Sequence, residues 1–268
     1  MGCQKDLDFD VPPGVGAHLS YYWTMDEAAD LNKIDSAAAH SWTATTGNLS
    51  PAGLFSNGIQ LDCAFVGVAP FYHGLTNFDD LGLAFNSATS TGLSFWFWIK
   101  QVVAPNVAPP STLVSFSLQC HDPGYAPNNS NILISLTLGA ANVPEPTSQI
   151  IHNNFTDSTS VNQLFTFAPV IGAWHMLTVT LDLVAHTFNI YQDGVLLASV
   201  ADAIGFLTAP QGDMILKYSY GVAQPGVVIV DEFGLSLKGA LSLAQIVALF
   251  NANVGKTWPD ITAIVPYP

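Results

Sequence analysis

Charged side chains are scarce in this sequence, and arginine does not occur at all. Charged residues make up 10% of the chain, less than half the share of about 25% that is usual in soluble domains. The six basic residues are all lysines and stand against 20 acidic ones, so the formal net charge is −14. Arginine supplies the planar fork that grips phosphates and guanine edges. The composition therefore argues against nucleic acid and against an anionic membrane surface as partners.

Cysteine clusters, long apolar runs and an export signal are also absent. Cys3, Cys63 and Cys120 have no Cys-x-x-Cys spacing, which argues against a zinc site and leaves at most one disulfide. No stretch reaches about 18 consecutive apolar residues, so no membrane-spanning helix is expected. The N-terminus lacks the basic and apolar regions of a signal peptide. The stretch Cys3-Gln4-Lys5-Asp6 nevertheless resembles the mature start of a bacterial lipoprotein, an interpretation that requires a signal peptide upstream.

Hydrophobic residues, by contrast, make up 49% of the chain. One interpretation is a large and well-covered core in a single folding unit, which a β sandwich of 268 residues can form. The other is that part of a neutral surface is buried against further subunits. The composition alone leaves both interpretations open.

The stretch 92–100 carries the clearest strand pattern in the sequence. Its period of two places Phe95 and Phe97 on one face and Trp96 and Trp98 on the other. Both faces are therefore expected to be covered, as in a central strand of a sandwich. An exposed tryptophan pair would instead offer a platform for stacking sugars, but core packing is favoured because large aromatic side chains are mostly buried.

Short strands with turn signals between them predict an all-β sandwich or barrel. An Asp193-Gly194 turn closes one predicted hairpin. One helix is expected after Ser242, which forms a capping box with Gln245, and we expect this helix to close one open end of the two sheets. Further strands are predicted near residues 19–23, 59–63, 112–119, 131–138, 164–167, 174–183, 186–200, 213–218 and 227–235. The domain organisation predicted is an N-terminal arm (1–17), one domain (18–255) and a C-terminal arm (256–268).

Four short stretches between residues 18 and 259 carry motifs whose order and spacing along the chain are informative. They are Tyr22 to Glu27 with Asp35-Ser36; Ser94 to Lys100; Gly172 to Gly194; and Val230 to Phe233 with Leu241-Ser242 and 251–259. Together they resemble the laminin-G-like branch of the concanavalin A-like lectin and glucanase superfamily, and the last stretch resembles members found in phage genomes. The resemblance implies a jelly-roll sandwich of two antiparallel sheets with one short C-terminal helix. Its structural core would include Trp23, Trp96, Trp98 and Trp174.

Catalysis is not expected. The superfamily includes retaining glycoside hydrolases, which need two carboxylates about 5 Å apart. The three glutamates of this chain, Glu27, Glu145 and Glu232, are widely separated in sequence. For His175 a structural hydrogen bond is favoured, since no nucleophile partner is evident.

The resemblance also implies a calcium ion between the N-terminal region and the strand with the Asp-Glu pair. Asp26, Asp35 and Asp231 would then be ligands, with Glu27 or Asp62 nearby, because carboxylates suit this hard cation. The alternative is that these carboxylates cap turns by accepting backbone hydrogen bonds. Glycan binding is a further implication, for which loops with aromatic and amide groups provide the candidates Trp42, His73, Tyr125 and Asn128. Ordinary loop composition explains the same residues.

Three functional hypotheses follow. The first is a non-catalytic surface or decoration protein of a bacteriophage particle, located on the virion, contacting other virion subunits or further copies of itself, and binding glycans or the host surface. The second is a secreted or lipid-anchored carbohydrate-binding module located outside the cell or at its surface. A glycoside hydrolase is the weakest of the three.

Overall fold

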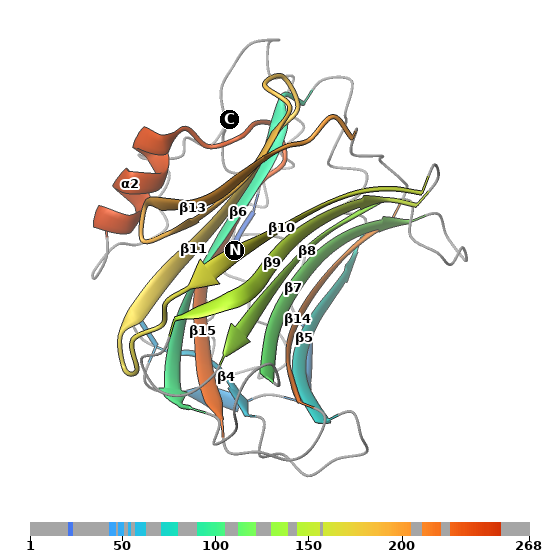
Figure 1. Ribbon diagram of the computed structural model, residues 1–268. Helices are drawn as coiled ribbons and strands as arrows, with labels where there is room; N and C mark the ends of the chain where they lie inside the picture. Colours follow the sequence, from blue (N-terminus) through green and yellow to red (C-terminus); the bar gives the residue numbers. More distant parts are fainter. Residues whose placement is uncertain are drawn as a thin grey trace, which may run out of the picture.

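The computed structural model describes residues 21–23, 43–46, 48–50, 53–54, 57–62, 71–79, 90–104, 112–121, 130–138, 144–155, 158–204, 211–220 and 226–252. These residues form two antiparallel sheets and one short helix (Figure 1). The all-β sandwich expected from the sequence is therefore confirmed. The predicted arms at 1–17 and 256–268 lie outside the described residues. Within the described part of the chain, no helix has the length and apolar character needed to cross a bilayer.

The first sheet has eight strands, and β6 lies at its centre. Strand β1 (Tyr21–Trp23) pairs with β15 beside the main path of this sheet. The order along the path is β13 (Val195–Ala201), β12 (Thr187–Gln192), β11 (Trp174–Asp182), β6 (Gly92–Val103), β15 (Val227–Ser236), β4 (Gly58–Asp62) and β3 (Asn48–Ser50).

The second sheet has seven strands and is strongly curved. Its concave side faces away from the first sheet (Figure 1). The order is β10 (Thr159–Phe167), β9 (Glu145–Asn154), β8 (Ser130–Leu138), β7 (Thr112–His121), β14 (Gln211–Tyr220), β5 (Phe71–Asp79) and β2 (Thr43–Thr46).

Aromatic side chains from both sheets fill the space between them. Phe95 and Phe97 of β6 meet Phe116 of β7 and Phe233 of β15, with ring centres 4.4 Å apart for Phe95 and Phe116 and 5.0 Å apart for Phe116 and Phe233. All four rings are almost completely buried. The period of two in the sequence of β6 thus assigned its core face correctly.

The opposite face of β6 packs under the helix α2 (Leu243–Asn251). Trp96 and Trp98 are 1% and 6% exposed and contact Ile246 and Leu249 within one apolar cluster. The alternative of an exposed sugar-stacking pair is thereby excluded for these two tryptophans. The expected position of the helix was wrong: α2 covers the outer face of the eight-stranded sheet, because this face carries a second apolar row that needs cover.

The other two predicted core tryptophans differ from this pair. Trp174 is half-buried at the rim of the same cluster, where the Lys100 ammonium lies 4.7 Å from the centre of its ring. Trp23 pairs with Phe233 in the backbone register, but its side chain lies outside the described residues.

Two local predictions from turn chemistry are confirmed. Asp193 and Gly194 have φ angles of 54° and 78° between β12 and β13, as a type I′ hairpin turn requires. At the start of α2, the Gln245 N–H donates to the Ser242 hydroxyl and the Ser242 N–H donates to the Gln245 side chain, which completes the capping box.

Candidate functional site

The outer face of the seven-stranded sheet is polar over the strands whose side chains are described. In β8, Ile132, Ile134 and Leu136 belong to the core between the sheets, while Asn131 and Thr137 alternate with them. In β9, Thr147, Gln149 and Asn153 also face outwards and Ile150 belongs to the core, although the buried positions of this strand include the polar residues Ser148, His152 and Asn154. This alternation is typical of a sheet with one buried face and one face open to solvent or to a ligand. We call the outward set the polar face; its members are Asn131, Ser135, Thr137, Thr147, Gln149, Asn153, Ser160 and Asn162. The three members in β8 are buried, at 9%, 6% and 1% exposure, so the accessible part of the polar face is formed by its members in β9 and β10.

Hydrogen bonds between neighbouring strands order the side chains of the polar face. The Asn153 amide donates to the Asn131 carbonyl oxygen over 2.9 Å. The Thr147 hydroxyl donates to the Thr137 hydroxyl over 3.1 Å. At the sheet edge, the Asn162 amide lies 3.5 Å from the Gln149 carbonyl oxygen. Amides and hydroxyls thus stand in cross-strand rows set by the register of β8, β9 and β10.

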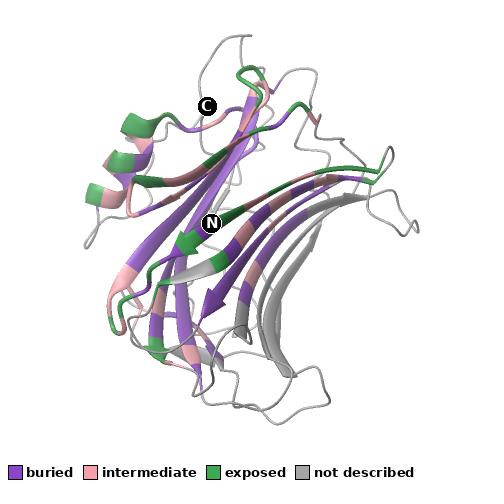
Figure 2. Ribbon diagram, in the orientation of Figure 1, coloured by how far each residue is buried: buried purple, intermediate pink, exposed green. Residues whose placement is uncertain are grey.

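Exposure falls across the polar face from the edge strand inwards. Strand β10 is largely exposed and β8 largely buried (Figure 2). Apolar side chains lie among the polar ones, with Ile151 and Leu133 paired across β9 and β8 and Leu164 56% exposed on β10. Phe155, directly after β9, is 39% exposed. The face therefore combines donors, acceptors and apolar contact area.

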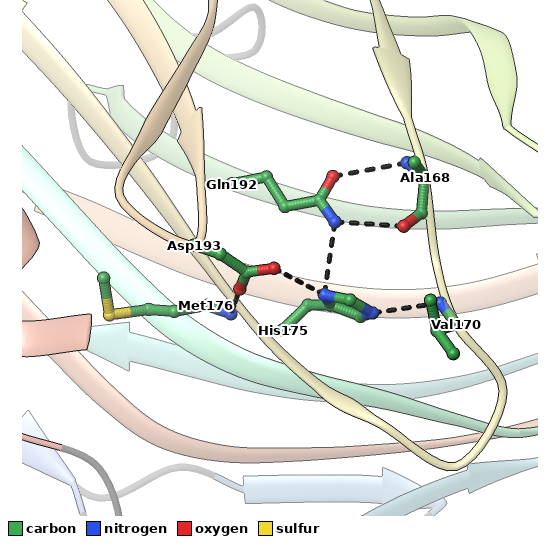
Figure 3. Close-up of polar contacts among 6 residues, drawn as sticks. All are labelled: Ala168, Val170, His175, Met176, Gln192 and Asp193. Carbon is green, nitrogen blue, oxygen red and sulfur yellow. Dashed lines mark hydrogen bonds and ion pairs between the residues drawn. The ribbon is translucent and has the colours of Figure 1, made fainter. Parts of the chain in front are cut away.

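A second polar cluster ties the segment before β11 to the β12–β13 turn (Figure 3). The Gln192 side chain accepts from the Ala168 N–H over 3.2 Å and donates to the Ala168 carbonyl over 3.0 Å. Asp193 accepts from the Met176 N–H over 2.8 Å and pairs with His175 Nδ1 over 2.7 Å. The cluster fixes the loop against two strands of the eight-stranded sheet.

His175 uses both ring nitrogens in this cluster. Its Nε2 accepts from the Val170 N–H over 3.0 Å, so in the neutral ring the proton is on Nδ1 and is donated to Asp193. A general base needs an accessible nitrogen that is not already occupied as an acceptor. The predicted structural hydrogen bond of His175 is confirmed.

Another buried histidine joins the two sheets. His152 of β9 in the seven-stranded sheet lies 2.7 Å from Asp202, which directly follows β13 in the eight-stranded sheet. Both side chains are fully buried. Asp202 also accepts from the Ile204 N–H, so a fully buried polar link holds the two layers together at this edge.

The Asp231-Glu232 pair lies at a bulge in β15. The register against β6 shifts between Asp231 and Gly234, and Glu232 has a φ of 51°. Asp231 is fully buried and accepts from the Leu54 N–H and the Glu232 N–H. Burial raises the pKa of the Glu232 carboxyl to about 9, so this carboxyl is neutral at pH 7.

Of the predicted calcium ligands, only Asp231 has a described side chain. Its two oxygens accept the backbone hydrogen bonds that were the alternative to metal binding. Asp26, Glu27 and Asp35 lie outside the described residues, and for Asp62 only the backbone in β4 is described. The side chains that are described contain no group of three metal-ligand residues. Calcium binding stays a prediction.

The predicted ligand-binding loop residues are also untested. Trp42, Tyr125 and Asn128 lie outside the described residues, and His73 is described only as a backbone position of β5 paired with Tyr218. Sequence reasoning missed the polar face, although the alternation of Asn131, Ser135 and Thr137 with Ile and Leu was a usable signal.

No protein-family model matches the sequence, and a search of curated proteins found no match. Among solved structures, the binding domain of Paraclostridial Mosquitocidal Protein 1 has a TM-score of 0.60 at 13% identity, covering 88% of this chain and 52% of that one. The binding domain of botulinum neurotoxin DC in complex with SialylT has a TM-score of 0.61 at 14% identity, covering 88% and 51%. A structure described as "Cell entry of botulinum neurotoxin type C is dependent upon interaction with two ganglioside molecules" has a TM-score of 0.60 at 15% identity, covering 88% and 51%.

These similarities define a class of fold: a two-sheet β sandwich shared with toxin binding domains. The chain spans about half the length of the solved structures it matches. At such low identity the likeness concerns the fold alone. The concanavalin A-like, laminin-G-like assignment stays a prediction beside it.

Proposed function

We propose that this chain is a non-catalytic carbohydrate-binding protein and that the polar face is its binding surface. The observation that carries the proposal is the set of amide and hydroxyl groups ordered in cross-strand rows on a concave sheet (Figure 1). Sugar hydroxyl groups both donate and accept hydrogen bonds, and asparagine and glutamine side chains offer both functions.

The rigidity of the polar face supports the same proposal. The side chains project from strands and are held by hydrogen bonds such as that between Asn153 and Asn131. Binding therefore immobilises few additional side chains, which reduces its entropic cost. Exposed Phe155 offers a ring for the apolar face of a sugar next to this row.

Two further observations favour binding over catalysis. Both ring nitrogens of His175 are held in structural hydrogen bonds. Two of the similar solved structures are described as binding domains, one of them in complex with SialylT, and the description of a third names an interaction with two ganglioside molecules. The proposal extends this kind of activity to the present chain.

A glycan array probed with the whole chain tests the proposal. We expect binding that falls at least about tenfold in a Gln149→Ala/Asn153→Ala variant, because two polar contacts are removed together. Asn189→Ala is the matched control, since Asn189 lies in β12 of the other sheet and its amide lies 3.3 Å from the Thr180 hydroxyl. Absence of glycan binding by the folded wild type, or equal effects of the two substitutions, would contradict the proposal.

A second candidate function is a component of a larger assembly such as a bacteriophage particle. Exposed apolar side chains favour it on the side of the molecule away from the polar face: Leu243 and Val247 of α2 are 56% and 37% exposed, and Leu196 of β13 is 49% exposed. Such side chains are common in surfaces that contact other subunits. Sizing of the purified chain tests this candidate; a stable monomer at high concentration would contradict self-association.

The narrower proposals have their own tests. The neighbouring genes test the location: capsid or tail genes alongside would support a virion surface, and their absence would favour an extracellular or cell-surface location. Calcium binding is tested by repeating the glycan array with a chelator.

A further inference from the structure

We infer that two copies of this chain associate through the edge strand β13 and the apolar side chains beside it. This association is independent of carbohydrate binding by the polar face. It gives the second candidate function a definite partner, which is a second copy of the chain, and a definite surface.

Strand β13 is an edge that another strand can extend. It ends the order of the eight-stranded sheet, so among the described strands of that sheet it pairs only with β12. Edge strands of soluble proteins are usually protected by charged side chains, proline, a bulge or a covering element. The strand Val195–Ala201 has a bulge at Leu197, but it contains neither a charge nor a proline. The backbone groups on its outer side, in the regular part 198–201, are therefore suited to pairing with a further strand.

The exposed side chains at the start of β13 are apolar and lie beside α2. Val195 and Leu196 are 64% and 49% exposed. The preceding Gly194 lies against the helix, because a Cβ atom there would be 3.4 Å from the Val247 side chain. Val247 and Leu243 stand one turn apart on α2, and both are exposed (Figure 2). Apolar side chains of two elements thus border the free edge, as in surfaces that contact other subunits.

The distribution of charge favours a second copy as the occupant of this surface. The chain carries a net charge of −14, so two copies repel each other over long range. Strands β12 and β13 and helix α2 contain no charged residue. Of the two aspartates that flank β13, Asp193 pairs with His175, and Asp202 is fully buried against His152. Two copies can therefore meet over these elements without placing like charges of the elements against each other.

A twofold arrangement suits the same surface. The same patch then serves on both copies, and the assembly closes at two chains. An edge strand pairs antiparallel with its own copy across such an axis, so no second sequence is needed to complete the interface.

Sedimentation velocity of the whole chain between about 1 µM and about 200 µM tests the association. We expect a dimer in the wild type. The Val195→Lys/Leu196→Lys variant should raise its dissociation constant at least about tenfold, because lysine at an edge strand opposes pairing with another strand.

Val102→Lys/Val103→Lys is the matched control. Both valines are 40% exposed at the end of β6, which lies three strands from β13, and the change in net charge is the same. The dissociation constant of this variant should change by less than about twofold. Glycan binding on the array should persist in both variants, because the polar face belongs to the other sheet.

Amide hydrogen exchange of the wild type at the two ends of the concentration range locates the interface. We expect slower exchange in residues 195–201 at the higher concentration, because outer N–H groups gain partners. A chain that stays monomeric overturns the inference, whether residues 195–201 are already protected by another segment of the same chain or remain open to a different protein. Protection confined to β10, the uncharged edge of the other sheet, or equal weakening by the two pairs of substitutions, overturns it as well. Each of these outcomes leaves carbohydrate binding by the polar face standing.

Discussion

Glu232 carries a carboxyl group that burial keeps neutral, and this has a consequence for stability. The pKa of the group is raised from an ordinary value of 4.5 to about 9 in the folded chain. Above pH 4.5 the unfolded chain releases the proton while the folded chain keeps it. The contribution of this group to stability is therefore complete below pH 4.5 and is lost as the pH rises towards 9.

Replacing Glu232 by Gln should remove this dependence. We expect the free energy of unfolding of the wild type to fall, relative to Glu232→Gln, by up to about 1.4 kcal/mol per pH unit between the two pKa values. Urea denaturation of both proteins across this range measures the difference. Parallel pH profiles would show that Glu232 is ionised in the folded state.

Gly234 occupies a position where any side chain would meet Trp96. A Cβ atom there would lie 2.0 Å from the Trp96 ring, and Trp96 is 1% exposed under α2. Because the ring cannot move aside, Gly234→Ala should cost at least about 3 kcal/mol.

Gly172 provides the matched control for Gly234. It has a φ of 78°, and a Cβ atom added there would have no other atom within 4 Å, so Gly172→Ala should cost only about 1 to 2 kcal/mol of backbone strain. Thermal and urea unfolding of the two variants measure the contrast. Equal losses in both would contradict the packing described for Trp96.

Among the elements, α2 stabilises the fold by covering the tryptophan row of β6. Ile246 is fully buried against this row, whereas its neighbour Val247 is 37% exposed. We expect Ile246→Ala to lower the free energy of unfolding by about 2 to 5 kcal/mol and Val247→Ala by less than about 1 kcal/mol. Tryptophan fluorescence during urea unfolding measures both. Similar losses of unfolding free energy in the two variants would contradict the packing of Ile246 against the tryptophan row.

The Gln192 cluster is expected to hold the segment before β11 in place. Gln192 is 8% exposed and makes two hydrogen bonds to Ala168, so Gln192→Ala removes both bonds, at a cost of about 1 to 3 kcal/mol. Amide hydrogen exchange should accelerate in residues 168–173. Gln163→Ala, at a partly exposed position in β10, should leave that exchange unchanged; acceleration in both variants would contradict a local role for the cluster.

The elements also show what the sequence could predict. The period of two in the sequence correctly predicted the strands β6 and β8 and correctly separated the two faces of β6. The Asp193-Gly194 pair predicted the hairpin turn, and the Ser242-Gln245 pair predicted the start of the helix. Strand β9 was missed, because it contains Pro146 and its only apolar pair, Ile150 and Ile151, is adjacent and so breaks the alternation. Its inward residue His152 is instead satisfied by Asp202, 50 positions away, a pairing that no local pattern contains.

In the molecule as a whole, the two sheets have different outer faces. The eight-stranded sheet turns a tryptophan row outwards and needs α2 over it, whereas the seven-stranded sheet turns amides and hydroxyls outwards on its concave side. The alternation in β8 could have indicated one polar side of that strand, but the polar face as a whole depends on the register that aligns β8, β9 and β10, which the sequence does not contain. The loop residues that the sequence analysis gave as candidates for glycan binding were chosen only because they carry aromatic or amide groups.

Mapping a bound glycan onto the chain tests carbohydrate binding by the polar face most directly. Isotope-labelled protein is titrated with the oligosaccharide that binds most tightly on the glycan array, and the amide chemical shifts are followed by NMR. We expect shifts concentrated in β8, β9 and β10, with β11, β12 and α2 unaffected. Shifts confined to the α2 side of the molecule, or to residues outside β8, β9 and β10, would contradict binding at this face.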